Sequence, residues 1–365
     1  MTSFNRWCVA ALLTLLVIAV PAALHALPAR DSDIGASDLL ERVRTAEDHP
    51  WSGYVQTQGA LALPVAEDFA DVGALFSDDL RMRAWWRGSD DWRVDRLLVS
   101  GETDLVHQHG VTIEWSYERD RATISRDPDI RLPRAADVVP PVLTERLLRD
   151  VSSDDVRRIP ARRVAGISAP GLRVEPSAPQ SSIDHVDLWA DPGSGVPLRV
   201  DVYAEDADSP SFVTELRDFS ASRPAPSTTT FDGADGIDVE HDDVLDIADA
   251  ANQYAPLRPP STVGGLDMSS ASDGAVGVYG VGITQLIAIP LRGREARPLR
   301  EQLRQTPDVA TSADDTLVTA GPVGVLLTGA ADDGGWLITG TVTAETLRQA
   351  AIDLARGTTY VGEVG

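Results

Sequence analysis

Lysine is absent from this chain of 365 residues, and cysteine occurs once, as Cys8. A single thiol excludes an intrachain disulfide, so the apolar core alone must stabilise the fold. All 32 basic residues are arginines, against 56 acidic residues, and the formal net charge is -24. A sequence without a basic stripe argues against nucleic-acid binding, because phosphate groups need cations to neutralise them. The same charge would repel an anionic lipid surface.

Motifs for catalysis and cofactor binding are also missing. The sequence has no P-loop, dinucleotide fingerprint, Gly-x-Ser-x-Gly elbow or metalloprotease helix motif, so no catalytic residue and no cofactor is predicted. His107 and His109 would share one face of a strand, but no further ligand follows, which favours a surface pair over a metal site. The acids between 232 and 249 miss the spacing of a calcium loop. No metal site is therefore predicted.

The N-terminus indicates export. Arg6 precedes an apolar run from Trp7 to Leu24, and acidic sequence begins at Asp31. A basic start followed by an apolar segment is typical of a secretion signal. The run is nearly long enough to span a bilayer, so an uncleaved anchor stays open as an alternative. We expect residues 1–30 to be a signal peptide or anchor, and residues 31–365 to lie outside the cytoplasm.

Most of the remaining chain alternates between apolar and polar residues with a period of two, which is typical of strands with one buried face. A helix is expected first, at 36–48, where Ser37 and Asp38 could cap its start. The alternating segments that follow are expected to be strands of an antiparallel barrel or sandwich. These segments are 80–88, 92–98, 111–117, 172–176, 183–189, 198–203 and 212–219.

Two interruptions divide the chain. A helix is expected at 142–150, in the middle of the strands, and a linker rich in Pro, Ser, Thr and acidic residues at 223–262. The remainder, 263–365, is expected to be a small α+β domain with a four-stranded sheet. Its elements are a strand-like stretch at 276–290, a helix at 295–305, strands near 316–319, 323–328 and 336–341, and a helix at 343–355 that Thr343 could cap.

The strand series resembles a known superfamily. The residues that indicate this are Ser52-Gly53-Tyr54-Val55, the Trp-rich strands at 84–98, Gly110 to Tyr117, and Asp187-Leu188-Trp189-Ala190-Asp191 followed by Gly195-Val196-Pro197-Leu198-Arg199. In this order they resemble the periplasmic lipoprotein carriers LolA and LolB over residues 36–221. The tail at 264–357 resembles the second domain of the sigma-factor regulator RseB. The resemblance implies an incomplete antiparallel β-barrel with a helical lid in domain 31–222, enclosing an apolar cavity for acyl chains.

The resemblance also implies where a ligand would lie, in a cavity that is open to water rather than filled by side chains. The alternative is that the same residues pack an ordinary sandwich core. The lid candidates are Leu143 and Leu147. The cavity candidates are Met82, Ala84, Trp86, Val94, Ile113, Trp115, Leu188 and Val200.

The predicted function is that of a non-catalytic protein outside the cytoplasm that binds a lipid, an acyl chain or a lipoprotein. One alternative is an RseB-like regulator that binds a membrane anti-sigma factor through its C-terminal domain. A weaker alternative is an exported hydrolase, because 56 acids could include a catalytic pair that the sequence does not single out.

Overall fold

The computed structural model describes residues 29–61, 70–77, 79–128, 130–232, 238–241, 244, 246–330 and 334–362. The predicted signal or anchor at 1–30 lies outside these residues, except for residues 29 and 30. Among the described helices, none is long and apolar enough to cross a membrane.

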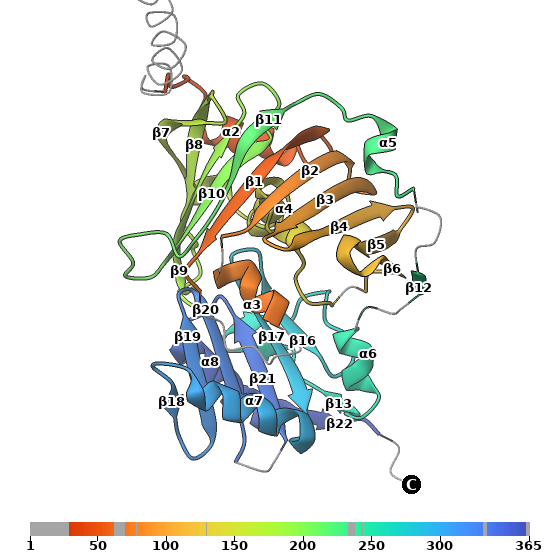
Figure 1. Ribbon diagram of the computed structural model, residues 1–365. Helices are drawn as coiled ribbons and strands as arrows, with labels where there is room; N and C mark the ends of the chain where they lie inside the picture. Colours follow the sequence, from red (N-terminus) through yellow and green to blue (C-terminus); the bar gives the residue numbers. More distant parts are fainter. Residues whose placement is uncertain are drawn as a thin grey trace, which may run out of the picture.

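The first domain is built on one large open sheet. The strand order is β12-β6-β5-β4-β3-β2-β1-β11-β10-β9-β8-β7, and every described pair is antiparallel except β12 with β6. The two end strands do not pair with each other in the described structure, so the barrel is incomplete, as predicted (Figure 1). The strands are β1 (Trp51–Gly59), β2 (Arg81–Gly88), β3 (Asp91–Leu98), β4 (Gly101–Gln108), β5 (Val111–Ser116), β6 (Arg121–Ser125), β7 (Val156–Val164), β8 (Ile167–Val174), β9 (Ile183–Ala190), β10 (Pro197–Ala204), β11 (Phe212–Ser220) and β12 (Asp238–His241).

Tight turns join neighbouring strands of this sheet. His109 and Gly110 between β4 and β5 both have positive φ, of 53° and 72°. Ala165 and Gly166 between β7 and β8 do the same, with φ of 48° and 79°. Two consecutive positive φ angles match the two-residue hairpin turn whose twist fits paired strands. His109 therefore lies in a turn rather than on the strand that carries His107.

Helices cover one face of the large sheet, which we call the inner face; the opposite face is the outer face. The first helix, α2 (Ala36–Arg44), buries Leu39, Leu40 and Val43 in the core. Its N-cap is Gly35, so Ser37 and Asp38 lie in the first turn instead of capping the helix, and no side chain caps it. The inserted helix α4 (Pro140–Leu147) starts two residues before the predicted bound, because proline is well accommodated in a first turn. The 3₁₀ helix η3 (Ala135–Val138) precedes it and is buried throughout.

The stretch predicted as a linker carries elements of its own. Helix α5 (Pro226–Thr229) packs against β2, β3 and β4, and the side chain of Thr229 is fully buried. Helix α6 (Ile247–Asn252) buries Ala248 and Ala251 in a small cluster with Ile130 and Val278. Short pairs follow, namely β13 (Leu257–Arg258) with β22 (Thr359–Tyr360) and β14 (Thr262–Val263) with β15 (Leu266–Asp267).

The second domain contains a smaller sheet with the order β16-β17-β21-β20-β19-β18 among the described residues, rather than the four strands expected. The stretch 276–290 is not one strand but the hairpin of β16 and β17, because Gly282 takes a positive φ in its middle. Helices α7 and α8 lie on opposite faces, since Leu326 packs with α8 and its neighbour Leu327 with α7. The elements are β16 (Gly277–Val281), β17 (Thr284–Leu291), α7 (Gly293–Gln305), β18 (Ala310–Thr311), β19 (Asp315–Ala320), β20 (Val323–Thr328), β21 (Gly335–Gly340) and α8 (Ala344–Gly357).

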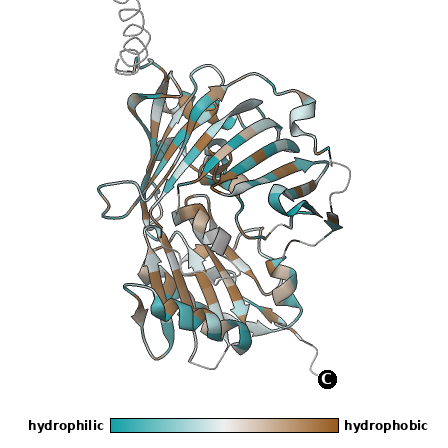
Figure 2. Cartoon of the chain, viewed as in Figure 1, coloured by the Kyte–Doolittle hydropathy of each residue, from teal (hydrophilic) through white to brown (hydrophobic). Residues whose placement is uncertain are grey.

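The hydropathy of the two sheets differs. Figure 2 shows alternating hydrophilic and hydrophobic residues along the strands of the large sheet, whereas the small sheet is more uniformly hydrophobic. Apolar and polar residues alternate along the strands of a sheet that has one face toward the core. In a sheet that is covered on both faces, successive residues along a strand can all be apolar. The small sheet, with a helix on each face, is of the second kind.

The two domains touch along a short seam. The backbone N–H of Ser182 donates to Thr341, and that of Thr343 donates to Gln180. The turn between β16 and β17 reaches the end of α4, and Ile283 from that turn is buried in the core of the first domain. The short helix α3 (Ala70–Ser77) follows β1 and also lies near this seam (Figure 1).

Candidate ligand-binding site

Six of the predicted cavity residues share the inner face of the large sheet. Ala84 lies directly opposite Val94, and Met82 is one pair further along the same face. Val200 lies directly opposite Leu188 on the other half of the sheet. The six belong to one core cluster and are at most 8% exposed. They are Met82, Ala84, Trp86, Val94, Leu188 and Val200.

Ile113 and Trp115 do not join them. The pairing places Leu105 opposite both Val94 and Glu114, so Glu114 is the β5 residue on the inner face. Because side chains alternate along a strand, Ile113 and Trp115 point to the outer face. There Trp115 contacts Phe231, with ring centroids 6.0 Å apart. This corrects the expectation that the apolar side chains of β2 and β5 line one cavity.

A row of stacked rings crosses the inner face. Trp51, Trp86, Trp92 and His107 are direct cross-strand neighbours on β1 to β4. Their ring centroids are 6.2, 5.5 and 5.3 Å apart, and each pair is nearly parallel. Such cross-strand aromatic pairs fix the register of neighbouring strands. The row therefore packs Trp86 between the rings of Trp51 and Trp92.

The lid candidates lie on α4, over this face. Leu143 and Leu147 are partly buried and pack against the core, while Leu148 just after the helix is almost fully buried. Arg44 of α2 donates to the backbone oxygens of Leu148 and Val151. This guanidinium ties the end of α4 to α2, so the two helices are fixed relative to each other at this point.

A buried ion-pair network anchors the segment before α4. Asp137 accepts hydrogen bonds from Arg131, at 2.7 and 3.0 Å, and from Arg146 on α4 at 2.5 Å. The backbone N–H of Arg134 donates to the same carboxylate. Burial opposes ionisation, but the hydrogen bond from Arg131 and the charges of both arginines hold the pKa of Asp137 below its ordinary value. The carboxylate thus joins η3 to α4.

A pocket of about 330 Å³ lies between α2 and α4. Trp86 is the one predicted cavity residue that lines it, and the other apolar walls are supplied by both helices and by Pro197. Its charged lining residues are Arg44, Glu47, Glu145 and Arg149. Partial desolvation and the neighbouring Glu47 carboxylate raise the pKa of Glu145. The apolar lining residues are Val43, Ala46, Trp86, Pro141, Val142, Leu148 and Pro197.

Sequence reasoning missed most of these lining residues. Val43 of α2 and Leu148 just after α4 belong to the core cluster of the first domain as well as to the pocket lining. Nothing local indicates that the two helices leave a gap, because they are about a hundred residues apart in sequence. A second, smaller pocket of about 190 Å³ lies at the domain seam, between Leu147 and the β16–β17 turn.

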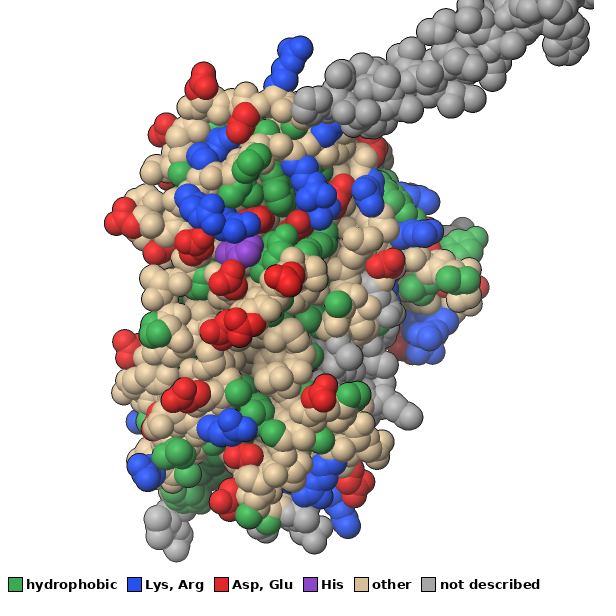
Figure 3. All heavy atoms as spheres, turned by 90° about the vertical axis from the view of Figure 1, so that its left-hand side faces the viewer, with side chains coloured by type: hydrophobic (Ala, Val, Ile, Leu, Met, Phe, Trp, Pro, Cys, Tyr) green, Lys and Arg blue, Asp and Glu red, His purple; other side chains and the backbone are tan. Residues whose placement is uncertain are grey.

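The outer face of the sheet is ionic. On β8 to β11, arginines and acids form ion pairs within and between neighbouring strands, and Figure 3 shows both charges side by side on this flank of the molecule. Arg173 donates to both oxygens of Asp187 at 2.5 and 2.6 Å. Arg199 contacts Asp201 at 2.7 Å, and both residues are largely buried. These pairs neutralise strand positions that the pleat places away from the core.

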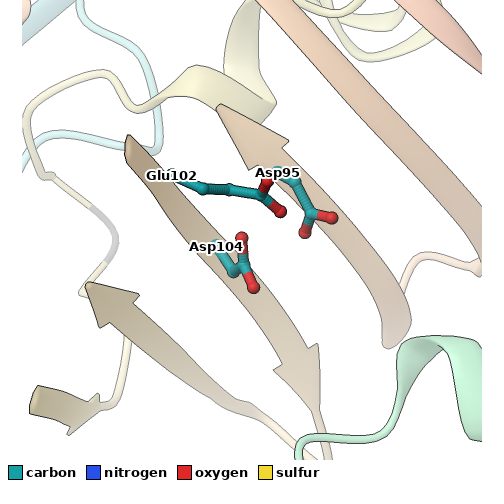
Figure 4. A group of neighbouring side chains, drawn as sticks. All are labelled: Asp95, Glu102 and Asp104. Atoms are coloured by element: carbon teal, nitrogen blue, oxygen red, sulfur yellow. The ribbon is translucent and has the colours of Figure 1, made fainter. Parts of the chain in front are cut away.

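A second ionic group lies on the outer face of the β3–β4 hairpin, where Asp95, Glu102 and Asp104 converge (Figure 4). Burial and the Asp95 carboxylate raise the pKa of Asp104 to about 8. The pKa of Asp95 is raised as well, chiefly by burial. The sequence contains the signal for this group, because Asp95 and Asp104 are placed symmetrically about a turn at 99–100. Only the pairing register brings them together.

Comparison with known proteins supports the architecture. No protein-family model and no curated protein matches the sequence. In the complex structure of Pseudomonas aeruginosa MucA and MucB, a chain 18% identical covers 90% of this chain and 99% of its own length, with a TM-score of 0.50. The structure of MucB in complex with MucA(peri) is 17% identical, with coverage of 90% of this chain and 100% of its own, and a TM-score of 0.49. A LolA-superfamily protein from Nitrosomonas europaea is 11% identical, with coverage of 54% of this chain and 98% of its own, and a TM-score of 0.26. At these identities the first similarity shows the fold alone. The chain therefore has the fold of the MucB structure over both of its domains, in agreement with the two-domain layout that the sequence resemblance predicts.

Proposed function

We propose that this chain is a non-catalytic protein that works outside the cytoplasm and takes an acyl chain, a lipid or the lipid part of a lipoprotein into the pocket between α2 and α4. The observation that carries the proposal is the pocket itself, which has apolar walls and charged groups among its lining. Its volume of about 330 Å³ is within the range of small-molecule sites. Such a lining suits an apolar chain that ends in a polar head.

The position of the pocket supports the same function. One wall is the fixed Trp86, held in the row of stacked rings, and the other is α4, whose lid residues are only partly buried. An apolar chain that enters here would cover side chains of both helices and gain roughly 25 cal/mol for each Å² removed from water.

A pocket-filling substitution tests the proposal. Val142 lines the pocket from α4 and is only partly buried, so Val142→Trp should fill the space without disturbing the sheet. Val361, half exposed near the C-terminus, gives the matched control Val361→Trp. The measurement is binding of a fluorescent fatty-acid probe to each purified protein. We expect the first variant to lose affinity by at least about tenfold, or 1.4 kcal/mol, and the control to bind as the wild type does.

Two results would count against the proposal. If the wild type does not bind the probe, the pocket is not an acyl site. If Val142→Trp binds as well as the control, the ligand lies elsewhere.

A second candidate function is regulation of a membrane anti-sigma factor through the C-terminal domain. It is favoured by one observation, the similarity over 90% of the chain to MucB, which was solved in complex with MucA. Native mass spectrometry of protein purified from its own host separates the two functions. A copurifying lipid supports the carrier, whereas a copurifying membrane protein supports the regulator.

A further inference from the structure

The three acids of the β3–β4 hairpin share one face of the sheet. Asp95 and Asp104 lie directly opposite each other, and Glu102 is two residues before Asp104 on the same side. A carboxylate oxygen from each lies within 4.8 Å of the other two. Figure 4 shows the three side chains turned toward one another from the two strands. Asp95 and Asp104 are 1% and 2% exposed, so this group is not a solvated surface cluster.

The three acids of the hairpin share a single paired arginine among the described residues. Arg93 donates to Asp95 Oδ1 at 2.5 Å and to Asp104 Oδ2 at 2.7 Å, so one guanidinium faces three carboxylates. Arg83 lies directly opposite Asp95 on β2, but it is exposed and forms no ion pair with it in the described structure. Like charges placed directly opposite each other on neighbouring strands destabilise a sheet. Among the described residues, the group therefore has more carboxyl groups than arginines paired with them.

An unsatisfied oxygen points to what is missing. Arg93 engages one oxygen of Asp104, whereas the other, Oδ1, has no accessible surface and no hydrogen-bond donor among the described residues. A buried polar atom without a partner is rare and needs a specific explanation, such as an ion.

We propose that Asp95, Glu102 and Asp104 bind a hard divalent cation of the size of Ca²⁺. An all-oxygen set suits Ca²⁺ rather than Zn²⁺, which prefers nitrogen and sulfur. Ca²⁺–oxygen distances of about 2.3–2.6 Å allow two ligating oxygens to be up to about 5 Å apart, which the 4.8 Å limit satisfies. Arg93 would hold the other oxygen of each aspartate, as residues around a metal site commonly do. Glu102, only partly buried, closes the site from the solvent side.

The site can be tested with Tb³⁺, an oxygen-preferring ion of similar size to Ca²⁺ whose luminescence is sensitised by nearby tryptophan. Trp115 lies directly opposite Asp104, so a bound ion would be close to an indole ring. Titration of the purified protein should give saturable luminescence that excess Ca²⁺ abolishes. Glu102→Gln should weaken Tb³⁺ affinity by at least about tenfold.

The matched control is Glu114→Gln. Glu114 is exposed on the inner face of neighbouring β5, so this variant removes the same charge without touching the site. It separates the site from diffuse binding to a chain with net charge -24. Absence of saturable luminescence would overturn the proposal, and so would equal affinities for the two variants.

Thermal unfolding gives a second, independent readout. Ca²⁺ should raise the midpoint of the wild type and of Glu114→Gln, but not that of Asp104→Asn. A Ca²⁺-induced rise that persists in Asp104→Asn would contradict the assignment of this residue as a ligand.

Discussion

Replacement of Met82 by alanine tests how far the ligand space extends into the first domain. Met82 is fully buried on β2, directly opposite Val55 on the next strand, and it does not line the pocket between α2 and α4. The sequence predicted it as a cavity residue, open to water when no ligand is bound. The structure places it in a packed core, so the two descriptions predict different losses of folding stability when the side chain is removed.

The expected cost follows from the atoms removed. Met82→Ala deletes Cγ, Sδ and Cε, and about 0.8 kcal/mol for each buried group gives a transfer loss of about 2.4 kcal/mol. The vacated space adds a cavity penalty, because a β-sheet relaxes only in part, so the total should be about 3 kcal/mol. For a domain of this size that corresponds to a fall of about 9 °C in the melting temperature.

Urea unfolding followed by circular dichroism and tryptophan fluorescence measures this cost, and the fatty-acid probe reports binding by the same variant. We expect a large loss of stability with little change in probe affinity at a temperature where the variant is folded. The reasoning would be refuted by a cost below about 1 kcal/mol together with lost binding. That result would mean that the inner face around Met82 is a ligand cavity and not a core.

Two further substitutions test the lid anchor and the second domain. Asp137→Asn leaves Arg131 and Arg146 without their carboxylate and should cost roughly 3 kcal/mol. Because the pKa of Asp137 is lowered in the folded state, its contribution is complete above the ordinary aspartate pKa and is lost as pH falls. Unfolding free energies measured across acidic pH should therefore fall less steeply in Asp137→Asn, and parallel curves would contradict this. Thr343→Ala removes the hydroxyl that accepts from the N–H of Thr346 at the start of α8 and should cost about 1 kcal/mol. An unchanged urea midpoint would show that this cap contributes nothing.

Local patterns predicted most elements because each depends on near neighbours in sequence. The stripe of Leu347, Ala350 and Leu354 with Thr343 before it defined α8 almost to the residue. The alternation in β2 and β3 likewise set their inner faces correctly. By contrast, β1, β4, β6 and β7 were not predicted as separate strands, because their apolar and polar residues alternate less regularly.

The predicted orientation of the side chains of β5 was wrong for a physical reason. Its apolar residues Ile113 and Trp115 were taken to face the core, whereas its inner positions are Thr112, Glu114 and Ser116. On the outer side, Phe231 from a distant segment contacts Trp115. An apolar stripe identifies a covered face, but it does not identify what covers it.

The sequence by itself determined the strand-rich first domain, the helix inserted in it and the small second domain, because periods of two and near 3.6 are properties of the local chain. The tertiary structure alone decided the pairing register, which brings Asp95 opposite Asp104 and separates Trp115 from Trp86. It also decided that α2 and α4 leave a pocket between them. Both depend on contacts between residues that are remote in sequence, and no local pattern encodes the distances between such residues.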